Sequence, residues 1–464
     1  MSFQMYSSYK DAGFVGLDQV PSHWDVLRFK QVFEEVNERS TTGEEELLSV
    51  SEYYGVKPRS QKIDEGEHLS RAESLEGYKL CDEGDLVMNI MLAWKRGLGV
   101  TNYRGIVSPA YAVFRLVRDD FPYYYHYLLR SNEYIGYFKT FSSGVIDSRL
   151  RLYPEVFGRL TAIVPPLNEQ TQIARFLDHE TAKIDALIRE QERLIALLQE
   201  KRQAVISHAA TKGLDPSVPM KDSGVEWLGE VPKHWRVVQV RHLLQMIEQG
   251  RSPECESRAV VGEEWGVLKT GCVNGGVYRP AEHKTLPAHI PPHSEYEVEE
   301  GDLLMSRASG SKDLIGAVAY VEKTPPRLLL SDKVFRLKLE PGVHPKNFTL
   351  LMGSRHVRTQ IELAINGAEG LANNITKESI KSFIVALPAF EEQKEIFTHL
   401  SMQSHRYVQL SEKLLTALNV LKERRSALIS AAVTGKIDVR DWQPPTDESP
   451  FSPEVREAGM EVTA

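Results

Sequence analysis

The chain contains Lys221-Asp222-Ser223-Gly224-Val225-Glu226-Trp227-Leu228-Gly229-Glu230-Val231-Pro232-Lys233-His234-Trp235, which repeats residues 10–24 with eight of 15 positions identical at an offset of 211. A second pair of blocks, residues 200–215 and 423–438, matches at eight of 16 positions but at an offset of 223. The 12-residue difference between these offsets (223 minus 211) falls between the blocks, where the two halves hardly resemble each other. We therefore predict one duplicated frame that holds two dissimilar inserts.

Each half also contains a long helical pattern. The patterns begin near residues 168–170 and 391–393, where acidic side chains suit the helix dipole, and they end at Gly213 and Gly435. Apolar residues recur at alternating three- and four-residue steps, which is typical of a coiled-coil seam. The predicted seam consists of Ile173, Leu177, Ile184, Leu187, Leu194, Leu198, Val205, Ile396, Leu400, Tyr407, Leu410, Leu414, Leu421 and Leu428. Two rods with matching stripes are expected to pack on each other, so we predict an antiparallel helix pair.

The inserts, residues 25–162 and 236–385, mix short β-rich runs with turns and short helices. Residues 111–116 and 333–337 are among the predicted strands. The fold class is therefore α+β, with two globular domains alternating with two long coiled-coil helices in a pseudo-two-fold repeat. The predicted boundaries are a first domain over 1–165, a first helical spacer over 166–214, a second domain over 215–388, a second spacer over 389–437, and an acidic, solvated tail over 438–464.

Composition limits the cellular setting without deciding the function. The net charge is −8, but residues 438–464 contribute −5 of it (seven acidic and two basic residues), so charge is neutral evidence for nucleic-acid binding. The three cysteines, none in a CxxC pair, fit a reduced cytosol and argue against structural zinc. We expect no membrane span, because no apolar run is long enough. The first six residues lack the pattern of a secretory signal, so a cytoplasmic location is expected.

Motifs for catalysis are missing from the sequence. It has no phosphate loop of the GxxxxGK[ST] type, and no Pro-Pro pair has the preceding Asn or Asp and the following aromatic residue that would grip an extrahelical amino group. His179 lacks the second histidine of a zinc-protease helix. We therefore do not expect this chain to catalyse a reaction by itself.

The duplicated frame resembles the specificity subunit of type I restriction–modification enzymes. The resemblance rests on residues 223–235, on the proline-to-Glu-Gln helix entries, and on the Glu-x-Arg-x-Ala-x-Ile-Ser helix ends, and it covers nearly the whole chain. It implies two target-recognition domains, each reading half of a split site in double-stranded DNA, and helices that space them and dock two methyltransferase subunits. It also implies that this chain binds no cofactor. S-adenosylmethionine would bind the methyltransferases, and ATP and Mg would bind two restriction subunits.

The second insert offers the most suggestive DNA-contacting run, residues 301–312, where a strand leads into a loop of basic and hydroxyl side chains. Such side chains suit base edges and phosphates, so we predict contacts from Ser306, Arg307, Ser309 and Lys312. Asn373 and Asn374 either pair with adenine or cap the short helix that begins near Thr376. Lys269 and Asn274 are a further candidate pair.

The first insert has counterparts of these runs. Lys95 and Arg96 follow the corresponding strand, and the neighbouring Trp94 is either a core residue or a DNA contact. Ser143 and Arg149 lie in the loop before the first long helix. The aromatic strip at residues 121–127 resembles a stacking platform but is more typical of a packed helix, and Trp24 and Trp235 are expected to be structural anchors.

Two other functions remain compatible with the sequence. One is a standalone DNA-modifying enzyme, which the missing cofactor and catalytic motifs disfavour. The other is a coiled-coil scaffold that does not read DNA, which the dissimilarity of the two inserts disfavours, because a symmetric scaffold has no need to diversify them.

Overall fold

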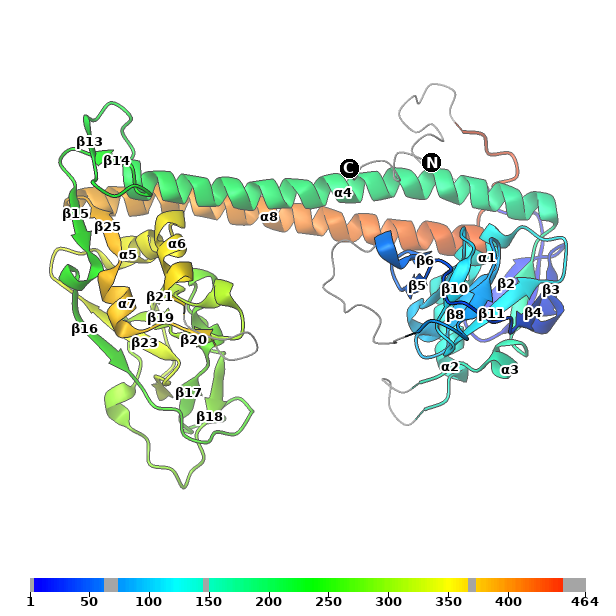
Figure 1. Cartoon of the computed structure of the whole chain (residues 1–464), viewed down its shortest axis with the longest axis horizontal. Coiled ribbons are helices and arrows are strands. Elements are labelled where there is room, and N and C mark those ends of the chain that lie inside the picture. The colour runs from blue at the N-terminus through cyan, green and yellow to red at the C-terminus, as the bar shows by residue number, and fades with distance from the viewer. Residues whose placement is uncertain (1–3, 62–73, 145–149, 366–372, 445–464) are drawn as a thin grey trace. The chain divides into compact units, whose positions relative to one another are not determined.

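The computed structural model describes residues 4–61, 74–144, 150–365 and 373–444. The chain forms two compact units: unit 1 comprises residues 1–192 and 416–464, and unit 2 comprises residues 193–415 (Figure 1). Unit 1 is thus assembled from both ends of the sequence, whereas unit 2 is continuous.

Unit 1 is built on a four-stranded antiparallel sheet with three helices. The sheet has the order β4-β11-β8-β9, formed by β4 (Phe33–Val36), β11 (Tyr111–Leu116), β8 (Leu86–Asn89) and β9 (Leu98–Val100). The helices are α1 (Pro122–Leu129), α2 (Asn132–Phe141) and α3 (Pro154–Phe157). Buried aromatic rings join them; Phe29 and Phe157, for example, stack with their centroids 4.4 Å apart. Tyr124 and Tyr125 are fully buried, so the aromatic strip at residues 121–127 packs a helix, as predicted.

Among its described residues, unit 1 also has four two-stranded pairs. They are β1 (Tyr9–Phe14) with β2 (Leu17–Pro21), β3 (Asp25–Arg28) with β12 (Thr161–Val164), β5 (Leu48–Ser51) with β6 (Gly55–Pro58), and β7 (Lys79–Cys81) with β10 (Gly105–Val107).

Unit 2 has a four-stranded antiparallel sheet of the same strand order by sequence. Its order is β16-β23-β19-β21, formed by β16 (Leu244–Gln249), β23 (Val334–Leu339), β19 (Leu303–Ser306) and β21 (Val318–Tyr320). The helices α5 (Pro345–Met352), α6 (Arg355–Ala364) and α7 (Lys377–Ser382) accompany it. The smaller sheets are β13 (Met220–Asp222) with β14 (Glu230–Pro232), β15 (Arg236–Gln239) with β25 (Ile384–Leu387), β18 (His283–Thr285) with β17 (Gly266–Leu268) and β22 (Leu328–Leu329), and β20 (Ala308–Ser309) with β24 (Asn373–Asn374).

An arginine–aspartate ion pair holds the Gly-Asp-Leu turn that precedes a central strand of each sheet. In unit 1 the Arg115 guanidinium donates to both carboxylate oxygens of Asp85, with Nε 2.9 Å from Oδ1. In unit 2 the Nε of the buried Arg336 lies 3.1 Å from Oδ2 of Asp302. The aspartate therefore ties its turn to the neighbouring strand in both units.

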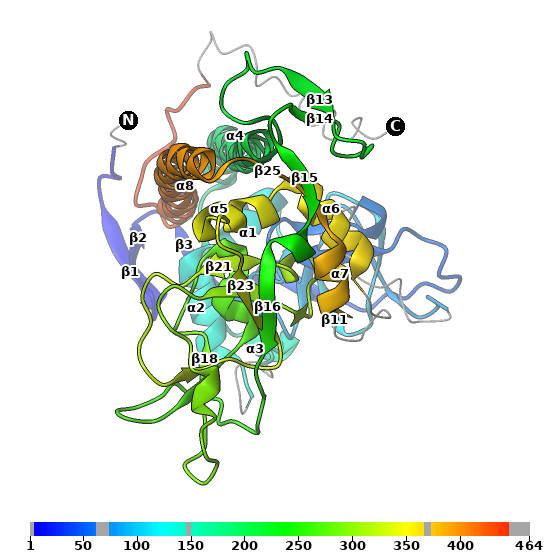
Figure 2. The same ribbon diagram turned by 90° about the vertical axis from the view of Figure 1, so that its left-hand side faces the viewer.

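The predicted long helices are α4 (Leu167–Lys212) and α8 (Phe390–Val433). Within unit 1, Arg425 of α8 pairs with both carboxylate oxygens of Asp185 of α4, at 2.7 and 3.1 Å. Lys422 lies 3.4 Å from Glu192, so the two helices run in opposite directions there. In unit 2, Ile206 of α4 shares a core with Ile396 and Leu400 of α8, and Figure 2 shows the two helices side by side beside α5.

The predicted seam is only partly buried. Ile173, Leu177, Ile184, Ile396 and Leu400 are at most 5% exposed. Leu198, Val205, Tyr407, Leu414, Leu421 and Leu428 are half-buried. The prediction was wrong for Leu187, Leu194 and Leu410, which are 52%, 39% and 46% exposed. A heptad pattern repeats every 3.5 residues, whereas a straight helix has 3.6 residues per turn. Residues that follow a strict heptad therefore do not all lie on one face of a straight helix.

Each long helix begins with the same clamp. Glu169 accepts hydrogen bonds from Trp24 Nε1 at 2.9 Å and Tyr6 OH at 3.1 Å, and its other oxygen lies 2.6 Å from His23 Nε2. In unit 2, Glu392 accepts from Trp235 Nε1 at 3.0 Å and lies 2.9 Å from His234 Nε2. Trp24 and Trp235 are structural anchors, as predicted, and in both units the glutamate of the repeated Glu-Gln pair contacts the repeated His-Trp pair.

The segment after α8 differs from the predicted solvated tail. Its described part, residues 438–444, is packed onto unit 1: Val439 is 1% exposed, and the ring of Trp442 lies 5.3 Å from that of Phe176. The Gln172 side chain donates to the carbonyl of Val439 at 3.2 Å. The apolar Val439 and Trp442 have a complementary surface on α4, which composition does not reveal. Residues 445–464 of the predicted tail lie outside the described residues.

Candidate nucleic-acid interface

The structure brings together two predicted segments of unit 2 that lie about sixty residues apart in sequence. Strand β19 ends at Ser306, and the chain continues through Arg307 into β20, which pairs with β24 so that Ala308 faces Asn374 and Ser309 faces Asn373. The next backbone amide, of Ile375, donates to the carbonyl of Arg307 at 3.0 Å. Arg307, Ser309, Asn373 and Asn374 therefore form one surface at the end of the central strands.

Basic side chains surround this surface. The guanidinium of Arg307 lies 6.0 Å from the ring centroid of Phe335 and donates to the Asp332 carbonyl at 3.1 Å. Lys377 Nζ lies 5.8 Å from the centroid of the same ring. The backbone carbonyl of Lys333 accepts a hydrogen bond from the Arg307 amide at 2.9 Å, and Lys333 is exposed. We call Arg307, Lys333 and Lys377 the basic face of unit 2. Three cations around one strand end suit a phosphate backbone, because neutralised phosphates release counterions.

Other predicted contacts of unit 2 have different positions. Ser306 is fully buried, so the prediction that it contacts DNA was wrong; strand β19 is covered on both faces. Lys312 is exposed in the turn after β20. Lys269 directly precedes the 3-10 helix Thr270–Gly276, and Asn274 lies within it. This helix packs against β19 and β21.

The capping alternative for the two asparagines does not hold. The cap of α7 is Thr376, whose side chain accepts a hydrogen bond from the Ser379 amide at 3.1 Å. Asn373 and Asn374 are instead half-exposed residues of β24.

Unit 1 has an equivalent surface with different side chains. Leu152 donates its amide to the Ile90 carbonyl at 2.8 Å, which matches the bond from Ile375 to Arg307 in unit 2. The preceding residue, the exposed Arg151, exchanges backbone hydrogen bonds of 2.9 and 3.0 Å with Ser143. Arg151 thus occupies the position that Asn374 has in unit 2. The predicted Arg149 lies outside the described residues.

Two lysines of unit 1 lie close to the ring of Trp94. Trp94 is 8% exposed and donates from Nε1 to the Met91 carbonyl, so it is a core residue. Lys95 Nζ and Lys139 Nζ lie 4.9 and 5.3 Å from its ring centroid. We call Lys95, Lys139 and Arg151 the basic face of unit 1.

Arg96 has a structural role that the prediction did not include. It adopts a left-handed backbone conformation with a φ of 62°, and its side chain donates to the Arg130 carbonyl and to Asn132 Oδ1. Its guanidinium therefore connects the strand end to the start of α2.

Four residues of the two basic faces were missed by sequence reasoning: Lys139, Arg151, Lys333 and Lys377. Each is distant in sequence from the strand end that it adjoins, and only the pairing of remote segments brings it there. An alignment of the two inserts that matched Leu152 with Ile375 would have placed Arg151 at the position of Asn374 and so marked it as a candidate.

The described residues contain no group of three or more His, Cys, Asp or Glu side chains that could hold a metal ion, and no helix among them is both long and apolar enough to cross a membrane. Burial raises the pKa of the Cys81 and Cys272 thiols to about 12, so neither is a thiolate at neutral pH.

Comparison with known proteins identifies the class. Residues 232–420 match the family described as the type I restriction modification DNA specificity domain. The EcoEI specificity subunit of Escherichia coli is 28% identical over 242 residues, which are 52% of this chain and 40% of that protein. The MjaVIII specificity subunit of Methanocaldococcus jannaschii is 22% identical over 93% of this chain and 98% of its own length.

A solved structure supports the fold. A chain from a type I restriction–modification system superposes with a TM-score of 0.66 at 15% identity, covering 90% of this chain and 99% of that one. The chain as a whole is related to the specificity subunits of type I restriction enzymes, which confirms the resemblance drawn from the repeat.

Proposed function

We propose that this chain is the DNA-reading subunit of a type I restriction–modification complex, in which unit 1 and unit 2 each read one half of a split, asymmetric site. The observation that carries the proposal is the pair of basic faces. Both lie where a remote backbone amide, of Leu152 or Ile375, closes on the residue after the central strand. Different side chains at the same position are what two different half-sites require.

The proposal includes the internal two-fold repeat and a partner for each half. Equal strand order in the two sheets and the two Glu–His–Trp clamps support a duplicated frame. Exposed apolar side chains on the long helices offer docking surface for two methyltransferase subunits. These side chains are Leu187, Leu194, Leu197, Met402, Val408, Leu410, Leu415 and Val420.

The chemistry would belong to the partners. The described residues of this chain contain no metal-binding cluster. We propose that S-adenosylmethionine is held by the methyltransferase subunits, and ATP with Mg by two restriction subunits, in a cytoplasmic complex. The specificity chain itself would bind double-stranded DNA and fix the distance between the half-sites.

Long-read methylome sequencing tests the proposal. The chain and its methyltransferase partner are expressed in cells that lack adenine methylation, with each protein omitted in turn as the control. We expect N6-methyladenine at a split, asymmetric motif only when both proteins are present. A complex that co-purifies but leaves no mark and binds no DNA would favour the scaffold function instead.

A further inference from the structure

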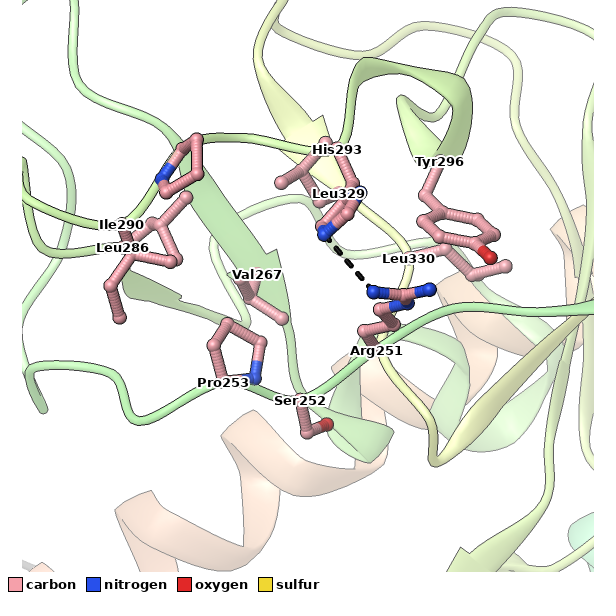
Figure 3. A pocket seen from close by; sticks show the side chains of 11 residues that line it. Arg251, Ser252, Pro253, Val267, Leu286, Ile290, His293, Tyr296, Leu329 and Leu330 are labelled. Atoms are coloured by element: carbon pink, nitrogen blue, oxygen red, sulfur yellow. Dashed lines mark hydrogen bonds between the residues drawn. The ribbon is translucent and has the colours of Figure 1, made fainter.

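A pocket of about 320 Å³ lies in the outer part of unit 2, beside the small sheet β18-β17-β22 (Figure 3). Its floor is apolar and consists of Val267 of β17, Leu329 of β22 and Leu286, each 5% exposed. Ile290 forms a wall, and Arg251 lies at the rim. The pocket therefore combines an apolar floor with one cation at its opening.

Hydrogen bonds define the rim. Arg251 Nη1 lies 3.2 Å from His293 Nε2, and Nδ1 of the same histidine lies 3.0 Å from Glu295 Oε1 (Figure 3 shows the first contact). When Nε2 of His293 accepts from Arg251, Nδ1 donates to Glu295, so both ring nitrogens have partners. Arg251 is then oriented by His293, while the rest of its exposed guanidinium faces the solvent.

The rim is continuous with the basic face of unit 2. The Arg251 amide donates to the Leu330 carbonyl at 3.2 Å, and the Ser252 hydroxyl donates to the carboxylate of Asp332. The carbonyl of Asp332 in turn accepts from Arg307 at 3.1 Å. A single segment, residues 330–333, therefore links the pocket to Arg307 and Lys333, so a DNA backbone that follows these cations passes the pocket.

The largest apolar group on the base edges of duplex DNA is the 5-methyl group of thymine, which lies in the major groove among hydrogen-bond donors and acceptors. The C–H groups of the other bases project less far into the groove. An apolar floor flanked by cations for the neighbouring phosphates complements that combination. Two carboxylates lie next to the pocket lining: Glu295 Oε1 is 3.0 Å from His293 Nδ1, and Asp332 accepts a hydrogen bond from the Ser252 hydroxyl.

We propose that this pocket receives the 5-methyl group of a thymine in the half-site read by unit 2, which makes Val267, Leu286 and Leu329 specificity-determining residues. The inference rests on the proposed function and adds a particular base to it.

Replacing thymine by deoxyuridine tests the proposal, because it removes the methyl group and leaves base pairing intact. The full chain is titrated by fluorescence anisotropy with duplexes that carry its motif, each with one thymine of the unit 2 half-site replaced, on either strand. At one position we expect about a fourfold loss of affinity, because burying one methyl group contributes roughly 0.8 kcal/mol. A half-site without thymine, or no sensitive position, would overturn the proposal.

A filled pocket provides the second measurement. Ile290→Trp is expected to occupy the pocket and to abolish the difference between thymine and deoxyuridine at the sensitive position. Val261→Trp, at a residue 72% exposed and outside the pocket lining, is the matched control and should keep the difference. If Ile290→Trp weakens binding to both duplexes equally and the difference persists, the pocket does not receive the methyl group. A chain that binds no specific DNA at all would instead reject the proposed function.

Discussion

Single side chains in this protein have sharply different tasks even when they are neighbours in sequence. Lys95 lies exposed over the Trp94 ring, whereas Arg96 turns inward to the Arg130 carbonyl. Ser306 is buried, whereas Arg307 lies at the surface of the strand end. In the first pair, Arg96 follows the 3-10 helix Ala93–Lys95 with a left-handed backbone, which turns its side chain away from that of Lys95. In the second pair, Ser306 is the last residue of β19, which is covered on both faces, whereas Arg307 lies beyond the end of the strand.

The lysines of the basic face should control the salt dependence of DNA binding. In the double variant Lys333→Ala, Lys377→Ala we expect the slope of log Kd against log salt to fall by about 1.8, or about 0.9 for each lost phosphate contact. Lys338→Ala, at an exposed lysine paired with Glu248 at the other end of β23, should leave the slope unchanged. An unchanged slope in the double variant would place the DNA elsewhere.

His126 should make unit 1 sensitive to mild acid. Burial, helped by the charge of Arg130, lowers the pKa of His126 to about 3. Since the ordinary value is about 6.5, the unfolded chain binds the proton first, and stability is lost as pH falls below about 6.5 toward 3.

Between pH 6.5 and 5, before most carboxylates titrate, the loss approaches about 1.4 kcal/mol per pH unit. Urea unfolding of His126→Gln and of the native chain at several pH values measures it. The variant should lose this dependence; an equal slope in both proteins would contradict the assignment.

At the scale of elements, burial changes sharply between neighbouring turns of a long helix. Ile184 is 5% exposed, while Leu187, three residues later, is 52% exposed. Both are equally good members of the heptad pattern, so the pattern alone does not rank them.

Their alanine variants should therefore differ in stability. Ile184→Ala is expected to lower the free energy of unfolding by about 3 kcal/mol, because a cavity replaces buried methyl groups. Leu187→Ala should change it by no more than about 0.5 kcal/mol. Chemical denaturation followed by circular dichroism compares the two. Equal losses would mean that Leu187 is covered in solution.

At the scale of the whole molecule, unit 1 depends on residues from the far end of the sequence. Tyr124 donates from its hydroxyl to the Val433 carbonyl at 3.3 Å, and Tyr9 donates to the Gly435 carbonyl at 3.1 Å. A Cβ atom at Gly435 would lie 2.4 Å from Pro21, so only glycine allows this approach. Unit 1 cannot be completed until the end of α8 has been synthesised.

The Trp442 side chain should contribute to this closure. Trp442→Ala is expected to destabilise unit 1 by about 2 kcal/mol, because Phe176 and His179 lose the ring that covers them. Hydrogen exchange should rise in unit 1 and stay constant in unit 2, which serves as the internal control. Exchange that rises equally in both units would argue against a local role.

Replacing one insert tests the division of labour in the molecule. Residues 236–385 are exchanged for the corresponding insert of another specificity subunit, and the methylome is sequenced again. One half of the motif should change and the other should persist, because each basic face belongs to one unit. A change in both halves would mean that the units do not read DNA independently.

The sequence by itself determined the internal repeat, the two long helices and the resemblance to type I specificity subunits. These follow from local signals: apolar periodicity, helix stops at Gly213 and Gly435, and the repeated His-Trp and Glu-Gln pairs. Predicted strands such as β11 and β23 were also confirmed, because short β-branched and aromatic runs bounded by turns specify them locally.

Only the tertiary structure decided which side chains share a surface. Lys377 adjoins Arg307 because β24 pairs with β20, and Val439 is buried because α4 offers it a surface. The same holds for the exposure of Leu187 and the burial of Ser306. Contacts between remote segments depend on how the segments pack and on the register in which their strands pair. No local pattern in the sequence specifies that packing or that register.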